Sequence, residues 1–394
     1  MTSTLLFTLA VFILLATLLR QPMLLTPAYL LAGAWVLGRL WAYQAMKQVT
    51  CNRTFVNRAF LNDKVIVRVI VRNNGRLPVL WLRLHDSLHS GLGPPVFDRA
   101  ISLRPFETRE FDYVLLANKR GSFHVGPLSL TSGDVFGLAA PRRQQLNASP
   151  LMVYPRVVPL EQLQLPSRQL LGALKYREPI HEDPNRARGK RAYVAGDSLR
   201  RVDWKASAAL GTLQVKQFEP SVSVEALIAL NLCRTDYDRM AWIDGTELAI
   251  VTAASVANWL IERRQKVGML IHASTQHAEP TLLGTRSGRP HMIQMLERLA
   301  LVQPDQEAPF AVPLQYAITK GNWGTTLIVI TGQANPALIQ QLLDARRRGL
   351  SPVLIACGYG TRIDAVRRQC ATFGIPAYHV LRERDMRVAL VASG

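Results

Sequence analysis

The stretch Val224–Leu232, "VEALIALNL", decides the fold of the C-terminal part of this 394-residue chain. It is a nearly continuous apolar run, which is typical of a strand buried on both faces of a parallel sheet. A helical pattern follows from Thr246 to Arg264, and strand-like and helix-like segments then alternate. These segments are "VGMLIHA", "MIQMLERLALV", "TTLIVIT", "PALIQQLLDARRRG", "PVLIAC", a further helix and "PAYHVL". The order predicts an α/β doubly wound parallel sheet over residues 224–394.

Residues 55–150 carry a different pattern, with a period of two. Lys64–Arg72, "KVIVRVIVR", alternates apolar and basic residues and is followed by the turn sequence "NNG" and by "PVLWLRLHD". This arrangement indicates a β-hairpin. Further short strands are expected at Phe111–Leu116 and Ser122–Leu130. We therefore expect a β-sandwich-like domain, with a small β-barrel as the alternative, and then an irregular linker over residues 151–223.

The first 46 residues hold two long apolar stretches. Thr4–Leu19 has no charged residue, and Met23–Trp41 has only Arg39 near its end. Each stretch approaches the roughly 20 residues with which a helix crosses a bilayer. A signal peptide is disfavoured because the N-terminus has no basic side chain, and two core helices remain the other alternative. We expect a transmembrane helical hairpin over residues 1–46, embedded in membrane lipid, with its positive flanks and the folded domains in the cytoplasm.

The excess of basic residues limits the kinds of partner that the chain is expected to attract. Lys and Arg number 47 against 28 Asp and Glu, a formal net charge of +19, which favours phospholipid, nucleic acid or an acidic protein face. Nucleic acid is the least favoured, because the basic segment Glu182–Tyr193 interleaves a single aromatic residue. The cysteines show no metal or disulfide spacing, and neither a P-loop nor a Ser-His-Asp set is found. The four cysteines are Cys51, Cys233, Cys357 and Cys370.

The segment Tyr193–Ala208, "YVAGDSLRRVDWKASA", places two aspartates among basic residues. One interpretation is a loop that satisfies its own charges, with Asp197 and Asp203 paired to Arg200, Arg201 and Lys205 and with the Trp204 ring buried as an anchor. The other is a docking surface for a protein partner, since Arg and Trp are enriched at interface hot spots. Catalysis by the two aspartates is less favoured, because the neighbouring arginines hold both carboxylates ionised. The candidate partner-binding residues are Gly196, Asp197, Arg200, Arg201, Asp203, Trp204, Lys205 and Lys216.

The longer stretch Arg191–Glu219, "RAYVAGDSLRRVDWKASAALGTLQVKQFE", and Arg120–Leu138, "RGSFHVGPLSLTSGDVFGL", resemble the bacterial family called domain of unknown function 58. The resemblance is carried by Gly196-Asp197, Arg200, Asp203-Trp204 and Lys216. It implies a C-terminal domain similar to von Willebrand factor A domains. Members of the family commonly accompany a MoxR-type AAA+ ATPase, so the resemblance implies a non-enzymatic adaptor at the bacterial inner membrane that binds such an ATPase.

Von Willebrand A domains often hold Mg²⁺ through a D-x-S-x-S motif. The corresponding residues here are Asn231, Cys233 and Thr235, so the anionic ligand is missing, although Asp236 and Asp238 follow closely. An amide and a thiol do not offset the cost of dehydrating Mg²⁺. We expect a degenerate site and no cofactor. The alternatives are a metal-dependent von Willebrand A-type binding module and a hydrolase acting on an anionic substrate.

Overall fold

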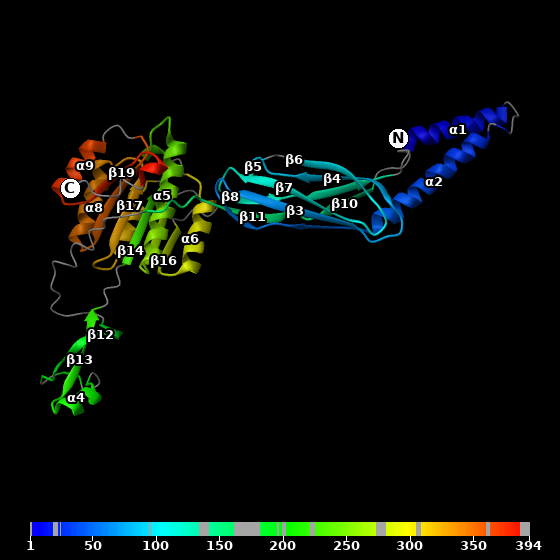
Figure 1. The fold of residues 1–394 in the computed structure, drawn as a ribbon. Helices are drawn as coiled ribbons and strands as arrows, with labels where there is room; N and C mark the ends of the chain where they lie inside the picture. Colours follow the sequence, from blue (N-terminus) through cyan, green and yellow to red (C-terminus); the bar gives the residue numbers. More distant parts are fainter. Residues whose placement is uncertain are drawn as a thin grey trace. The chain divides into compact units, whose positions relative to one another are not determined.

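The chain forms two compact units in a computed structural model (Figure 1). One unit comprises Met1–Arg156 and Leu296–Leu301, and the other comprises Val157–Met295 and Val302–Gly394. The structure describes residues 2–18, 23, 25–93, 96–133, 142–160, 182–194, 197–198, 202–220, 225–272, 281–304, 309–359 and 363–386.

Two helices begin the chain, α1 (Thr2–Leu18) and α2 (Leu25–Lys47). Among the residues that the structure describes, neither these nor any other helix combines the length and the apolar character needed to cross a membrane. The predicted transmembrane hairpin is therefore wrong. With 17 residues and a rise of about 1.5 Å each, α1 is shorter than a hydrocarbon core of about 30 Å. The end of α2 is instead a packing element, because Met46 is buried and its carbonyl oxygen accepts a 3.1 Å hydrogen bond from Gln144 Nε2.

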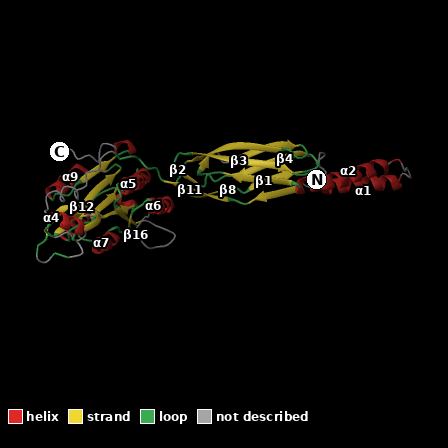
Figure 2. Cartoon of the chain, turned by 60° about the horizontal axis from the view of Figure 1, so that its bottom comes forward, coloured by secondary structure: helices red, strands yellow, loops and turns green. Residues whose placement is uncertain are grey.

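Residues 49–154 form a β-domain of three sheets (Figure 2). The first sheet has the order β1 (Val49–Thr54), β3 (Lys64–Asn73), β7 (Thr108–Ala117), β5 (Leu92–Gly93). The second has the order β10 (Arg142–Leu146), β9 (Leu128–Ser132), β4 (Val79–Ser87), β6 (Val96–Leu103). The third has the order β2 (Arg58–Phe60), β11 (Ser149–Tyr154), β8 (Gly121–Val125). Alternate side chains of these strands, such as Val67 and Leu84, are fully buried in one core, as the period of two predicted.

The predicted hairpin between β3 and β4 is wrong, although both strands are present. β3 pairs with β1 and β7, whereas β4 pairs with β6 and β9. The buried side chain of Asn73 explains the difference. Its Nδ2 donates to the carbonyl oxygens of Leu77 (2.8 Å) and Arg104 (3.1 Å), and its Oδ1 accepts from the Gly75 N–H (3.0 Å). The turn "NNG" therefore leads the chain from one sheet into another.

A buried ion pair connects the first two sheets. Arg53 in β1 contacts Asp86 in β4 through Nη1 and Oδ2 at 3.0 Å, and both side chains are fully buried. Tyr113 in β7 donates its hydroxyl to Asp86 Oδ2 at 2.6 Å. The Arg53 Nη2 group donates to the Asn147 carbonyl oxygen at 3.0 Å. Because buried charges require partners of this kind, the triad fixes which strands face each other across the core.

The C-terminal unit contains the predicted parallel sheet, with strand order β16-β15-β14-β17-β18-β19. All its strands run parallel except β16, which pairs antiparallel with β15. The strands are β14 (Glu225–Asn231), β15 (Lys266–His272), β16 (Thr281–Arg286), β17 (Thr326–Thr331), β18 (Ser351–Cys357) and β19 (Ala377–Val380). The helices are α5 (Trp242–Glu262), α6 (Arg289–Leu301), α7 (Ala311–Lys320), α8 (Pro336–Arg347) and α9 (Ile363–Thr372), and Leu296–Leu301 of α6 belong to the first unit. The sequence prediction missed β16 and α7.

Strand order places a switch point at β14. β15 pairs with one edge of β14 and β17 pairs with the other. The connections that follow the carboxyl ends of β14 and β17 therefore lead to opposite sides of the sheet. Ligands of such sheets usually bind at this edge. Asn231 at the end of β14 and Thr331 at the end of β17 are therefore the residues to inspect for chemistry.

Candidate functional site

The segment predicted as an irregular linker contains a small folded element, which we call the signature module. It consists of β12 (Glu182–Ala192), α4 (Trp204–Leu210) and β13 (Gln214–Pro220). β12 and β13 pair antiparallel, with Lys190 opposite Lys216. The helix begins at the N-cap Asp203 and ends at Gly211, whose φ of 68° is the left-handed conformation that glycine adopts without strain.

Asp203 holds the three elements of the module together. Its Oδ1 accepts a 3.1 Å hydrogen bond from the Ala206 N–H, and its Oδ2 lies 2.9 Å from Lys190 Nζ on β12. Its backbone N–H donates to the Gln214 carbonyl oxygen at 2.8 Å. The hydrogen bond from Lys190, followed by that from the Ala206 N–H, lowers the pKa of the Asp203 carboxyl. Lys216 adds a smaller attraction of the same sign.

Asp197 is satisfied in the same way by the neighbouring residue of β12. Its two carboxylate oxygens each accept a 2.6 Å hydrogen bond from Arg191, and Oδ2 also accepts one from the Val194 N–H at 3.0 Å. This bidentate pair raises the pKa of Arg191. The aspartates thus pair with Lys190 and Arg191 and not with Lys205, which corrects that part of the sequence interpretation.

The other predicted partners cannot be placed. Gly196, Arg200 and Arg201 lie outside the residues that the structure describes. Sequence reasoning missed Lys190 and Arg191 as partners because they lie in the basic segment before the motif. Their signal was the strand itself, since an antiparallel partner strand brings residues on either side of the motif together.

Trp204 is exposed, which contradicts the predicted buried anchor. The residue is 66% accessible on the first turn of α4. The module is instead anchored by the smaller residues Val202, Ala206 and Val215, which are buried. Lys205 and Lys216 are exposed as well. Exposed apolar side chains lie elsewhere on the module, at Val194, Leu210 and Leu213.

This arrangement limits the chemistry of the module. Each aspartate faces its own cation and backbone donor, and these contacts lower the pKa of Asp203, so its carboxyl is not poised to act as a general acid near neutral pH. The groups that remain available to another molecule are an indole ring and ammonium groups. Such a set supports binding through apolar contact and positive charge.

The carboxyl edge of the parallel sheet is closed around Asn231, which is 1% exposed. Its Oδ1 accepts from the Cys233 N–H at 3.0 Å, which fixes the orientation of the amide. Its Nδ2 therefore donates to Asp236 Oδ2 at 2.8 Å and to Thr331 Oγ1 at 3.0 Å. The Tyr237 hydroxyl donates to the Asn231 carbonyl oxygen at 2.6 Å. Every polar atom of the Asn231 side chain is thus used.

The remaining polar residues of this edge do not complete a cation site. Cys233 Sγ lies 3.1 Å from Thr235 Oγ1, and Asp238 Oδ1 accepts from the N–H groups of Met240 and Ala241. In the described part of the chain, no three His, Cys, Asp or Glu side chains group in a way that could hold a metal ion. A divalent cation binds oxygen acceptors, whereas the Asn231 amide presents two N–H donors to the carboxylate and the hydroxyl. The residues present here do not fit Mg²⁺.

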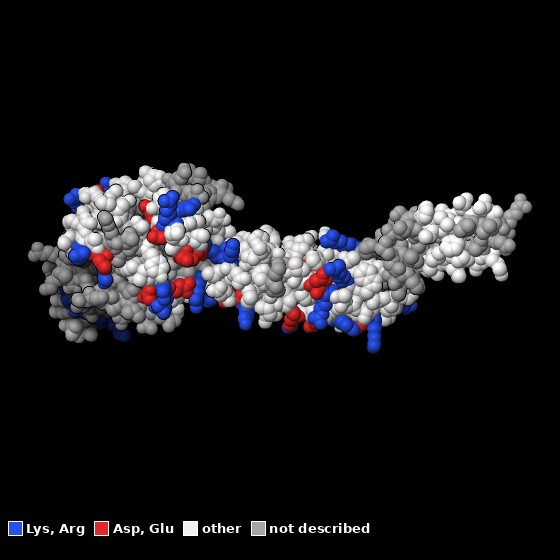
Figure 3. All heavy atoms as spheres, turned by 90° about the horizontal axis from the view of Figure 1, so that it is seen from above, with Lys and Arg blue, Asp and Glu red and all other residues white. Residues whose placement is uncertain are grey.

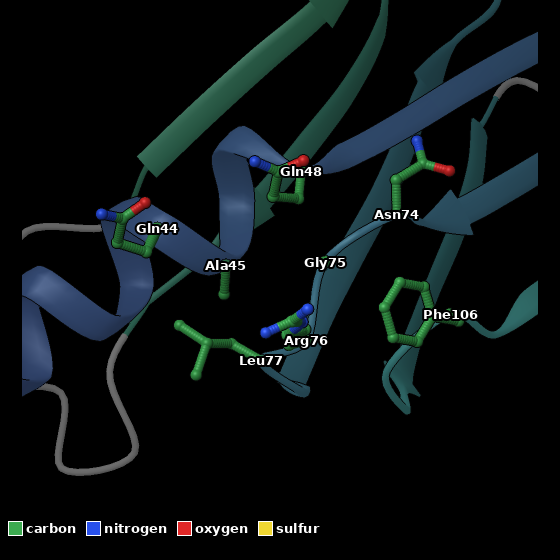
Figure 4. Close-up of a pocket in the computed structure, with 8 residues that line it drawn as sticks. All are labelled: Gln44, Ala45, Gln48, Asn74, Gly75, Arg76, Leu77 and Phe106. Atoms are coloured by element: carbon green, nitrogen blue, oxygen red, sulfur yellow. The ribbon is translucent and has the colours of Figure 1, made fainter.

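A further pocket in the described part of the chain has no carboxylate, histidine or cysteine in its lining. This pocket of about 530 Å³ lies beside the end of α2 and the turns of the β-domain (Figure 4). Its polar lining consists of amides and one guanidinium, from Gln44, Gln48, Asn74 and Arg76. On the face in Figure 3, acidic and basic side chains lie side by side over the β-domain. The ion pairs of this domain include Arg68–Asp112.

The fold and the site define a class of protein. This is a multidomain α+β chain in which Trp204 of the signature module is exposed, while Asn231 at the switch point of the sheet is buried. Residues 189–348 match the family model described as "Protein of unknown function DUF58". The chain is also 26% identical over 314 residues to the protein named "Uncharacterized protein YeaD" of Bacillus subtilis, covering 78% of this chain and 74% of that protein. These matches support the DUF58 family for this chain, as its sequence motifs predicted.

Solved structures show only partial similarity. The CARDB domain of the PF1109 protein from Pyrococcus furiosus, solved in complex with di-metal ions, covers 27% of this chain and 91% of its own, with a TM-score of 0.20 and 15% identity. Proximal thread matrix protein 1 of the mussel byssus covers 43% of this chain and 46% of its own, with a TM-score of 0.32 and 8% identity. Similarities of this size carry no argument about fold or function.

Proposed function

We propose that this chain is a non-enzymatic adaptor whose signature module docks onto a protein partner. The exposure of Trp204 carries the proposal, because an indole ring on a folded helix usually has a binding or packing role. The ring lies on a helix whose N-cap, Asp203, is tied to both strands of the module. The surface is therefore preorganised, which reduces the entropy that binding costs.

The family similarity suggests the partner. DUF58 proteins commonly accompany a MoxR-type AAA+ ATPase, and we propose such an ATPase as the protein that the module binds. We further propose that the C-terminal sheet is von Willebrand A-like. The alternation of strands with helices and the switch point at β14 support this assignment. The closed hydrogen bonding of Asn231 supports a form of that domain that binds without a metal ion.

A pull-down tests the docking surface. A purified MoxR-type AAA+ ATPase is incubated with the full chain, with Trp204→Ala, or with Met240→Ala as the matched control. Met240 is 95% exposed and lies outside the module. We expect the wild type and Met240→Ala to retain the ATPase and Trp204→Ala to lose about tenfold or more in affinity, as for a hot-spot aromatic residue.

Two results would overturn the proposal. If the wild type does not retain the ATPase, the ATPase is not the partner of this chain. If Trp204→Ala retains the ATPase as well as the wild type does, Trp204 is not part of the docking surface. Amide exchange at Ala206 must show that the Asp203-capped helix is intact in this variant.

A further inference from the structure

A groove between α7 and α8 has no role in the function proposed above. It has a volume of about 490 Å³. Its walls are formed by the outer face of α7 and one residue of α8. The lining residues are Ala311, Val312, Gln315, Tyr316, Thr319 and Gln341.

The two faces of α7 differ sharply. Leu314, Ala317 and Ile318 are buried in the core of the sheet together with residues of α8. On the opposite face Val312 is 72% exposed and Tyr316 is 50% exposed, one helical turn apart. The sequence thus places two large apolar side chains on a face that packing of the domain does not require.

Hydrogen bonds hold the groove in shape at both ends. Gln341 Nε2 of α8 donates to the Ala311 carbonyl oxygen at 2.8 Å, which ties the start of α7 to the middle of α8. At the other end, Arg348 Nη1 lies 3.4 Å from Thr319 Oγ1. The spacing between the two helices is therefore set before any ligand binds.

The charge around the groove selects the sign of its ligand. Lys320 Nζ lies 5.8 Å from the centre of the Tyr316 ring, and Arg348 lies at the same end beside Thr319. The lining itself contains no carboxylate. A second copy of this chain is a poor occupant, because each copy carries a formal net charge of +19.

The helical walls select the conformation of the ligand. Backbone groups within a helix are already paired, so the groove offers no strand edge to an extended peptide. A helix satisfies its own backbone and presents one apolar stripe. The outer face of α7 spans about 15 Å over its 10 residues, which matches a partner helix of about three turns.

We propose that the α7–α8 groove binds an amphipathic helix of a partner protein. The helix places its apolar stripe on Val312 and Tyr316 and an acidic residue beside Lys320 and Arg348. This binding site lies outside the signature module and stands independently of the ATPase proposal.

Selection from a phage-displayed library of helical peptides of about 18 residues tests the proposal, with the full chain as bait. We expect enriched sequences with apolar residues at i, i+3 or i+4 and with Asp or Glu near one end. A synthetic peptide of the enriched sequence is expected to bind Val312→Glu, and the double variant Lys320→Glu/Arg348→Glu, about tenfold or more weakly than the wild type. Val56→Glu, which alters a valine 67% exposed in the β-domain, is the matched control and is expected to bind like the wild type.

Three outcomes would overturn this inference. They are the absence of enriched helical sequences, enrichment of sequences without acidic residues, and binding that Val312→Glu does not weaken. Sedimentation velocity measures whether the chain self-associates. A dimer that Val312→Glu dissociates would also overturn the proposal.

Discussion

The sheet edge around Asn231 and the signature module around Asp203 contain similar polar residues but differ in what they leave exposed to solvent. At the edge, the amide, a carboxylate and a hydroxyl bond to one another and are enclosed. In the module, each aspartate is satisfied by a cation of β12, and the ring of Trp204 stays in solvent. In both regions the polar residues maintain the local structure. The comparison shows that polar motif residues can serve the local structure and do not by themselves mark a reactive site.

The largest effect is expected from breaking the enclosed network. Asn231→Ala removes the acceptor of the Cys233 N–H and the donor to Asp236, which leaves buried polar groups without partners. We expect the free energy of unfolding to fall by about 2–4 kcal/mol in urea denaturation. Asn335→Ala removes an N-cap of α8 and is the matched control, with an expected loss of about 1 kcal/mol. Equal losses in the two variants would show that the edge is not a closed network.

A negative charge at position 231 tests whether the sheet edge can be made to bind Mg²⁺. Asn231→Asp places a second carboxylate beside Asp236 and removes the two N–H donors. We expect the variant to be less stable than the wild type without metal, and Mg²⁺ at ten times its dissociation constant to restore about 1.4 kcal/mol. Melting temperature with and without Mg²⁺ measures this. A rise in the wild-type melting temperature would contradict our assignment of the edge as unfit for the ion.

Removing the aspartate of the module is expected to have a smaller, local effect. Asp203→Ala loses the cap of α4 and the partner of Lys190, and the destabilisation is expected to stay within the module because solvent screens this ion pair. Hydrogen exchange at the Ala206 N–H measures the change. Asp203→Asn keeps a capping oxygen without the charge, so exchange close to that of the wild type is expected. If both variants exchange equally fast, the ion pair and not the cap stabilises the helix.

The same residue gives the module a pH dependence of known sign. The pKa of Asp203 is lower in the folded module than in the unfolded chain. Its contribution to stability is therefore complete above the unfolded pKa and is lost as the pH falls through the folded pKa. We expect exchange at Ala206 to accelerate in acid relative to a reference amide of α5, and this acceleration to be absent in Asp203→Asn.

The smallest effect on stability is expected at Trp204. Because the ring is 66% exposed, Trp204→Ala is expected to change the free energy of unfolding by less than about 0.5 kcal/mol. Trp259→Ala, at a buried position of α5, is the matched control with an expected loss of about 3–5 kcal/mol. A large loss at Trp204 would mean that the ring packs inside the module, and the comparison with Asn231 would fail.

Local patterns were sufficient to predict most strands and helices of the C-terminal sheet. The run at Val224–Leu232 became β14 because a strand buried on both faces needs apolar residues throughout. The missed helix α7 contains Pro313, which breaks the helical pattern but is tolerated in a first turn. The turn "NNG" resembled a hairpin, yet the pairing of β3 depends on bonds of Asn73 to distant residues. Long-range pairing of this kind leaves no local signal.

The site was predictable in its residues but not in its contacts. The sequence motif contains Asp197 and Asp203, yet the partners of these two carboxylates lie on β12, whose register follows from its pairing with β13. Burial of Trp204 was inferred from the size of its ring, which is a tendency of aromatic residues and not a rule. Exposure depends on how much core the module can provide, and three small apolar residues do not cover an indole.

The buried triad of Arg53, Asp86 and Tyr113 has a mechanical consequence for the β-domain. An apolar core tolerates small offsets between its layers, since hydrophobic contact has no preferred direction. A two-oxygen contact between the guanidinium of β1 and the carboxylate of β4 does have one, so sliding one sheet past the other would leave two charges stranded in the interior. The domain is thus resistant to shear, and a load applied to one sheet is passed to the other with little distortion.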